Sequence, residues 1–123
     1  MAVSISEVKK YLREKNHRER IHRQDLFKRA VEDFAGMVDH IKRNYGNITI
    51  YQWGSLLHPE DFDENSDIDM AVAGINSSEI FFKLYGELLK MTDFPLDFVE
   101  FDRIDIIHQK SIKEKGRLVY GKD

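Results

Sequence analysis

The spacing of apolar residues changes at Gly46, and this change limits the folds open to the chain more than any other feature. Before Gly46, apolar residues recur every three or four positions, which predicts an amphipathic helix with one buried face. These residues are Phe27, Val31, Phe34, Val38, Ile41 and Tyr45. After Gly46, the segment Ile48 to Trp53 is rich in β-branched and aromatic side chains, which predicts a strand. Helices and a sheet are therefore combined, and we expect an α/β (α+β) fold.

The first third of the chain is predicted to be helical. Ser4 and Glu7 have the spacing of a capping box, so a helix is expected to begin at Ile5. Gly46 stands where a helix favours a left-handed residue at its carboxyl end. One long helix, or two with a bend near Asn16, would fill residues 5–45.

Shorter elements follow in an alternating order. Strands are predicted over residues 48–53, 68–73, 96–101 and 118–120. A loop over 56–65 separates the first two strands, and a helix over 104–115 precedes the last. A further helix is capped by Ser77 or Ser78, and its expected buried face is Ile80, Phe81, Leu84, Tyr85, Leu88 and Leu89. We expect one domain over residues 1–123, with an N-terminal helical segment at 1–45 and a core at 46–121.

Composition excludes several classes of protein. The 123 residues contain no cysteine, which excludes a disulfide scaffold, a thiol nucleophile and any cysteine-ligated metal or cluster. No run approaches the roughly 20 apolar residues of a membrane helix. The N-terminus lacks the apolar stretch of a signal peptide. We therefore expect a soluble, cytoplasmic domain that does not enter a membrane.

Charge is distributed unevenly along the chain. Residues 1–45 carry 11 Lys/Arg and 7 Asp/Glu, a net charge of +4, whereas residues 46–123 carry 8 and 15, a net charge of −7. Acidic and basic side chains alternate in the first segment, so a solvated helix face is favoured over a nucleic-acid interface. The acidic second segment favours a bound cation, because clustered carboxylates repel one another.

Three aspartates have the placement expected of metal ligands. Asp67 and Asp69 flank Ile68 on a predicted strand, so both carboxylates point to the same face of the sheet. Asp97 lies in an otherwise apolar strand, where an unpartnered carboxylate is costly. If the two strands are neighbours, the three carboxylates can form a cluster that bridges two metal ions, an arrangement used for displacement at phosphorus.

Other residues near this cluster are less informative when taken alone. Gly54-Ser55 ends the first strand, where a glycine lets the backbone approach a phosphate and a serine can bond to it. Tyr51 and Trp53 could stack on a base, although aromatic residues of a strand more often belong to the core. His58 lies in the loop that follows and could contact a phosphate. No glycine-rich dinucleotide or P-loop motif is present.

Together these motifs resemble a known family. In order along the chain they are Tyr51-Gln52-Trp53-Gly54-Ser55, Asp67-Ile68-Asp69 and Asp97. The pattern is similar to the signature of the DNA polymerase β nucleotidyltransferase superfamily, and the short chain is similar to its minimal (MNT-type) members. The resemblance covers about residues 46–121. It implies a small mixed sheet, with helices mainly on one face, preceded by the long N-terminal helical segment.

The resemblance also implies a function and a set of site residues. Asp67 and Asp69 would bind two Mg²⁺ (or Mn²⁺) ions, Asp97 would complete the second metal site and activate the acceptor hydroxyl, and Gly54 and Ser55 would hold the phosphates of the nucleotide. The implied reaction transfers AMP from ATP to a hydroxyl. MNT-type domains often pair with a HEPN-domain toxin, so the implied role is that of an antitoxin that adenylylates this partner.

Two alternatives to a protein adenylyltransferase stay open. Leu56, Leu57, His58 and Pro59 follow Gly54-Ser55, where many family members carry an arginine and a further glycine. This difference keeps open an antitoxin or regulatory protein with a degenerate nucleotide site that acts by binding alone. A small-molecule modifier of the aminoglycoside type is disfavoured, because the chain has no substrate domain. The surplus N-terminal helix suits either a protein partner or a homodimer.

Overall fold

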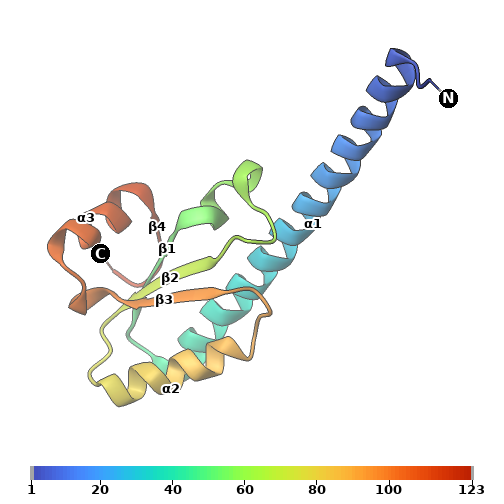
Figure 1. Cartoon of the computed structure of the whole chain (residues 1–123). Coiled ribbons are helices and arrows are strands. Elements are labelled where there is room, and N and C mark those ends of the chain that lie inside the picture. Colours follow the sequence, from blue (N-terminus) through green and yellow to red (C-terminus); the bar gives the residue numbers. More distant parts are fainter. Residues whose placement is uncertain (1, 123) are drawn as a thin grey trace.

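The computed structural model describes residues 2–122, which form three helices and one four-stranded sheet (Figure 1). The helices are α1 (Ile5–Tyr45), α2 (Ser78–Leu89) and α3 (Ile106–Lys115). The strands are β1 (Thr49–Trp53), β2 (Ile68–Ala73), β3 (Leu96–Glu100) and β4 (Arg117–Tyr120). Short 3₁₀ turns cover Gly54–Leu57, Pro59–Asp61 and Phe101–Arg103. Every predicted helix and strand is present, with ends shifted by no more than two residues.

The sheet is mixed, as expected, and its strand order is β3-β2-β1-β4. β1 pairs antiparallel with both β2 and β4, whereas β2 and β3 are parallel. A parallel pair needs a crossover between its strands, and α2 supplies it. The sequence predicts both β2 and β3, but it does not predict that they are neighbours in the sheet. Only the tertiary structure shows this pairing.

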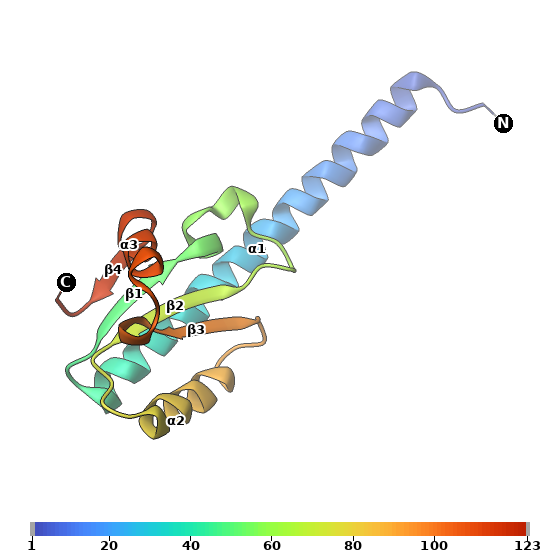
Figure 2. The ribbon, with the colours of Figure 1, turned by 60° about the vertical axis from the view of Figure 1, so that its left-hand side comes forward.

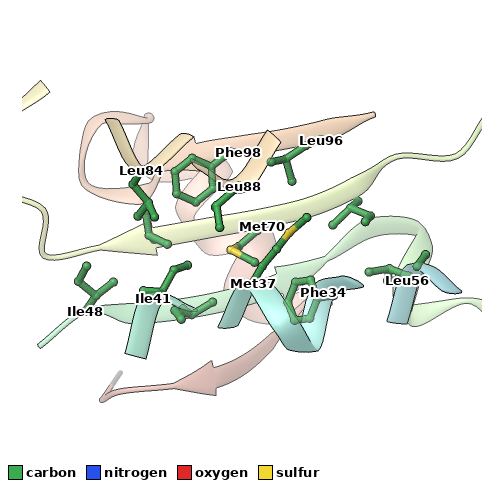
Figure 3. Packing of buried hydrophobic residues seen from close by; sticks show 14 of the residues in the cluster. Phe34, Met37, Ile41, Ile48, Leu56, Met70, Leu84, Leu88, Leu96 and Phe98 are labelled. Carbon is green, nitrogen blue, oxygen red and sulfur yellow. The ribbon is translucent and has the colours of Figure 1, made fainter. Parts of the chain in front are cut away.

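The helices cover the two faces of the sheet unequally. α1 and α2 pack on one face, where the larger hydrophobic core lies (Figure 3). α3 lies on the opposite face, where Ile112 joins a smaller buried cluster with Tyr51, Ala71 and Phe101 (Figure 2). Because side chains alternate along a strand, β1, β2 and β3 each supply residues to both clusters. The expectation of helices mainly on one face is therefore confirmed.

The N-terminal half of the chain is a single helix without a break at Asn16. The Ser4 hydroxyl caps it by accepting a hydrogen bond from the Glu7 backbone N–H at 3.1 Å. Gly46 follows its last residue with a φ of 70° and a ψ of −119°, a positive φ that favours glycine but not the left-handed helical conformation that was predicted. The helix leaves the sheet at its N-terminal end and extends into solvent, where residues 2–22 are all exposed (Figure 1).

The buried face of α1 is rotated from the predicted one. The residues that are buried are Leu26, Ala30, Phe34, Met37 and Ile41. Phe34 and Ile41 belong to both sets, but Val31 is 40% exposed. The apolar face of α1 is wider than the part that packs on the sheet. The spacing of apolar residues therefore did not predict which of them are buried. On α2, likewise, Ile80 and Leu89 are exposed although they were expected to be buried.

Among residues 2–122, no helix combines the length and the apolar character that crossing a bilayer requires.

Candidate active site

Asp67 and Asp69 stand at the start of β2 and face α3 rather than the main core. Their neighbours Ile68 and Met70 are fully buried in the main core on the other face, as strand alternation predicts. β3 runs parallel to β2 with Asp97 as the register partner of Asp69. The carboxylates that the sequence placed on two separate strands are therefore brought together at one position of the sheet.

The segment before β2 is held in place by local hydrogen bonds. The Asp63 carboxylate accepts a hydrogen bond from the Asn65 backbone N–H at 2.8 Å, and the Ser66 hydroxyl accepts one from the Asp63 backbone N–H at 3.0 Å. The Ile68 N–H donates to the Pro95 carbonyl at 2.8 Å, which joins the start of β2 to the start of β3. These bonds stabilise the alignment of the two strands that carry the carboxylates.

Repulsion and burial act together on the carboxylates. Asp69 is buried, whereas Asp67 and Asp97 are exposed. Burial, reinforced by the charges of Asp97 and Asp67, raises the pKa of Asp69 to about 7. Burial and the charge of Asp67 also raise the pKa of Asp97. Carboxylates with raised pKa values cluster at functional sites, where burial and neighbouring like charges shift their ionisation.

Gly54 and Ser55 lie directly against this cluster. Gly54 has a φ of +75°, and a Cβ at this position would overlap the Asp69 carboxylate and lie 2.8 Å from its Cγ. Ser55 donates its backbone N–H to Asp69, which partly opposes the rise in the pKa of Asp69. Glycine is therefore required here on two grounds, the positive φ and the close approach of a carboxylate.

The donor groups suit a hard divalent cation. Asp67, Asp69 and Asp97 offer the carboxylate oxygens that Mg²⁺ and Mn²⁺ bind, and a cation would relieve their repulsion. Within residues 2–122, no three His, Cys, Asp or Glu side chains are grouped closely enough to hold a metal ion as they stand. The chemistry of the cluster fits the cation, and binding would require these side chains to turn toward one another.

Some residues around the site were not predicted from the sequence. His108, Ser111 and Lys115 of α3 face the same side of the sheet and border Gly54. The sequence marked residues 104–115 only as a helix, and no local motif signals that one of its faces lines a site. His58, by contrast, was singled out, and its side chain lies beside the same residues.

A sequence profile described as "Polymerase beta, Nucleotidyltransferase" matches residues 38–123. The chain belongs to this nucleotidyltransferase family. The match includes all five predicted site residues, Gly54, Ser55, Asp67, Asp69 and Asp97, and its first residue lies within α1. A search of curated protein sequences found no match.

Solved structures share the fold of this nucleotidyltransferase domain. A crystal structure of the toxin–antitoxin pair MntA–HepT matches with a TM-score of 0.56 at 19% identity, over 73% of this chain and 71% of the other. A toxin–antitoxin structure with AMP-PNP matches with a TM-score of 0.58 at 20% identity, over 74% and 73%. A tri-AMPylated HEPN toxin of Shewanella oneidensis in complex with an MNT antitoxin matches with a TM-score of 0.58 at 18% identity, over 76% and 73%. At these identities the likeness shows the fold.

Proposed function

We propose that this domain is a metal-dependent adenylyltransferase that transfers AMP from ATP to a hydroxyl of a protein partner, and that the partner is a HEPN-type toxin. The observation that carries the proposal is the register pairing of Asp69 with Asp97 beside Gly54. This arrangement places carboxylates and a glycine turn together, as transfer of a nucleotidyl group requires.

The proposed reaction is a displacement at phosphorus. The acceptor hydroxyl oxygen forms a bond to the α-phosphorus of ATP while the bond from that phosphorus to the bridging oxygen breaks, releasing pyrophosphate. Asp97, which is exposed at the site, accepts the proton of the hydroxyl. Asp67, Asp69 and Asp97 would hold two Mg²⁺ or Mn²⁺ ions, whose charge stabilises the phosphates. Gly54 and Ser55 would bind the terminal phosphates through the backbone.

A protein acceptor agrees with the exposure of the site. Asp67 and Asp97 are open to solvent, so a tyrosine or another hydroxyl on a macromolecule can approach them. The related structures pair this fold with a HEPN toxin, with AMP-PNP and with AMPylated toxin. We extend the same partner and nucleotide to this chain, and propose a cytoplasmic location for it.

One observation favours a second candidate, an antitoxin that neutralises its partner by binding alone. The turn after Gly54 carries Leu56, which is buried, and His58, but no arginine that could hold a triphosphate. The carboxylates are also not grouped as three metal ligands among residues 2–122. A domain with these features could keep the fold and the partner without the chemistry.

The deciding experiment mixes the full chain with a purified HEPN-domain protein, ATP and Mg²⁺, and measures the intact mass of the partner. We expect the mass added by one or more AMP groups. Asp67→Asn and Asp69→Asn should each slow the transfer by roughly a hundredfold or more, because each removes a charged ligand of the metal ions that would stabilise the reacting phosphates. Both variants should stay folded, since relieving repulsion among the carboxylates does not remove packing.

The matched control is Asp93→Asn, an exposed aspartate in the turn before β3 that makes the same chemical change outside the cluster. This variant should transfer AMP at the wild-type rate. Near-normal transfer by Asp67→Asn and Asp69→Asn would show that the active site lies elsewhere. A wild-type chain that binds the partner tightly without modifying it would establish the binding-only antitoxin instead.

A further inference from the structure

The helical arm, residues 5–22 of α1, carries an apolar stripe that the domain leaves uncovered. Ile5, Val8 and Leu12 follow one another at spacings of three and four, so they share one face of the helix. All three side chains are exposed. An uncovered apolar stripe on a long helix is typical of a surface that packs against another helix.

This stripe faces the same side of α1 as the residues that pack on the sheet. Val8 precedes buried Leu26 by eighteen residues, and Leu12 precedes buried Ala30 by the same number. Eighteen residues make five turns at about 3.6 residues each, so the two members of each pair point in the same direction from the helix axis. α1 continues straight beyond the sheet (Figure 1). The stripe therefore faces the space beyond the end of the sheet rather than away from the domain.

That end of the sheet carries the candidate active site. Asp67 directly precedes β2 and Asp97 is the second residue of β3, and these two parallel strands begin at the same end. The arm borders the loop that leads into β2, because Lys15 lines a groove of about 510 Å³ together with Asp63 and Glu64. A partner seated on the stripe would therefore lie beside the edge at which its hydroxyl has to arrive.

Charge indicates the chemistry of such a partner. The arm has a net charge of +3, from six Lys/Arg and three Asp/Glu. Lys9 lies four residues after Ile5 and three before Leu12, so it borders the stripe on the helix surface. Within residues 2–122, no carboxylate forms an ion pair with Lys9 or Lys10. Two such arms would repel each other, so an acidic partner is favoured over a second copy of this chain.

We propose that the arm is the docking site for an amphipathic helix of the protein acceptor, one whose apolar stripe is flanked by acidic side chains. The apolar side chains of that helix pack on Val8 and Leu12, and its carboxylates lie beside Lys9. The proposal rests on the proposed transfer to a protein hydroxyl and adds to it the surface that holds the acceptor. The family profile begins at residue 38, so this surface lies outside the part of the chain that the profile matches. An acceptor held at the arm is concentrated beside the carboxylates before its hydroxyl reaches them.

The test measures binding of the full chain to a purified HEPN-domain protein by calorimetry without ATP, so that the result does not depend on transfer. Leu12→Asp should weaken this binding roughly tenfold or more, because it removes an apolar contact and adds a charge that an acidic partner repels.

The matched control is Ile21→Asp, which places the same charge on the same arm. Ile21 is 51% exposed and Leu12 is 47% exposed, so the two positions are alike in burial. Nine residues, or about two and a half turns, separate them, so Ile21 lies on the opposite face of the helix. Ile21→Asp should bind within roughly twofold of the wild type.

Two further measurements test the acidic character of the partner and the effect on transfer. Raising the NaCl concentration from about 50 to about 300 mM should weaken wild-type binding, and Lys9→Glu should weaken binding at low salt and reduce this salt dependence. With ATP and Mg²⁺, Leu12→Asp should raise the KM for the partner and leave kcat unchanged, since the substitution lies outside the candidate active site.

The outcomes separate this inference from the proposed function. Equal affinities of Leu12→Asp and Ile21→Asp, or binding that salt does not weaken, would overturn the arm assignment while the proposed transfer stands. Wild-type binding that Leu12→Asp weakens, without AMP transfer, would contradict the proposed transfer and support the arm assignment. A wild-type dimer that Leu12→Asp converts to a monomer in sedimentation equilibrium would assign the stripe to a second copy and overturn the proposal. If the wild type does not bind the HEPN-domain protein, the proposed partner and this inference both fail.

Discussion

At the scale of single residues, Gly54 determines how closely the Asp69 carboxylate can approach the turn that follows β1. Ser55 donates its N–H to that carboxylate, and the space for it exists because position 54 has no side chain. A buried carboxylate is costly unless hydrogen bonds or charges compensate it. Gly54 therefore affects both the conformation of the turn and the ionisation of Asp69, beside the proposed phosphate site.

We expect Gly54→Ala to lower the free energy of unfolding by about 1–3 kcal/mol, because the new Cβ meets the Asp69 carboxylate at a positive φ. Urea denaturation measures this loss, and calorimetry with ATP should show weaker binding. Gly86→Ala is the matched control, since this glycine lies within α2 and its added Cβ meets no atom within 4 Å. That control should be neutral or stabilising by up to about 1 kcal/mol. An equal effect of both variants would contradict the role assigned to Gly54.

At the scale of elements, two sets of polar contacts join α1 to α2 and to the turn between α2 and β3. Near its middle, Asp33 accepts a hydrogen bond from the Thr92 hydroxyl at 2.7 Å. Near its end, Glu87 accepts one from the Tyr45 hydroxyl at 2.7 Å and contacts the His40 ring at 2.8 Å. Both contacts are partly buried and flank the apolar core, so they set the position of α2 along α1.

Glu87→Ala should lower the free energy of unfolding by about 1–3 kcal/mol, because it leaves the hydroxyl of Tyr45 without its acceptor. The hydrogen bonds from His40 and then Tyr45 hold the pKa of Glu87 below its usual value. A carboxylate with a lowered pKa stabilises the fold above its unfolded pKa, and this contribution is lost as the pH falls through the folded pKa. Urea denaturation of the wild type between pH 7 and pH 3 should therefore show an acid loss that Glu87→Gln reduces. The same change at exposed Glu114 should leave the pH profile as in the wild type.

At the scale of the whole molecule, the chain divides into a packed domain and an exposed helical arm, residues 5–22 of α1 (Figure 2). This arm carries six Lys/Arg and three Asp/Glu, a net charge of +3. Its exposed apolar side chains include Ile5, Val8 and Leu12, which share one face of the helix at spacings of three and four. Because packing of an amphipathic face supplies most of the stability of a helix in a protein, contact with a binding partner would stabilise this exposed arm.

Removing residues 1–21 should change the free energy of unfolding of the packed domain by less than about 1 kcal/mol, because residues 2–21 contribute no buried side chain. Urea denaturation followed by near-ultraviolet dichroism checks this. If the arm holds the protein partner, the shortened chain should also lose binding to it in a pull-down. A large loss of stability would show that the arm packs on its own domain. Unchanged partner binding would assign the partner to another surface.

The sequence by itself determined the local structure and the identity of the candidate site residues. Capping by Ser4, the positive φ of Gly46 and the common face of Asp67 and Asp69 all follow from interactions between near neighbours in the chain. Only the tertiary structure decided that β3 lies parallel to β2 with Asp97 beside Asp69. It also decided that α3 borders the candidate site and that the N-terminal arm is exposed. Each of these depends on which distant segments meet, and neither the spacing of residues nor local propensity encodes that choice.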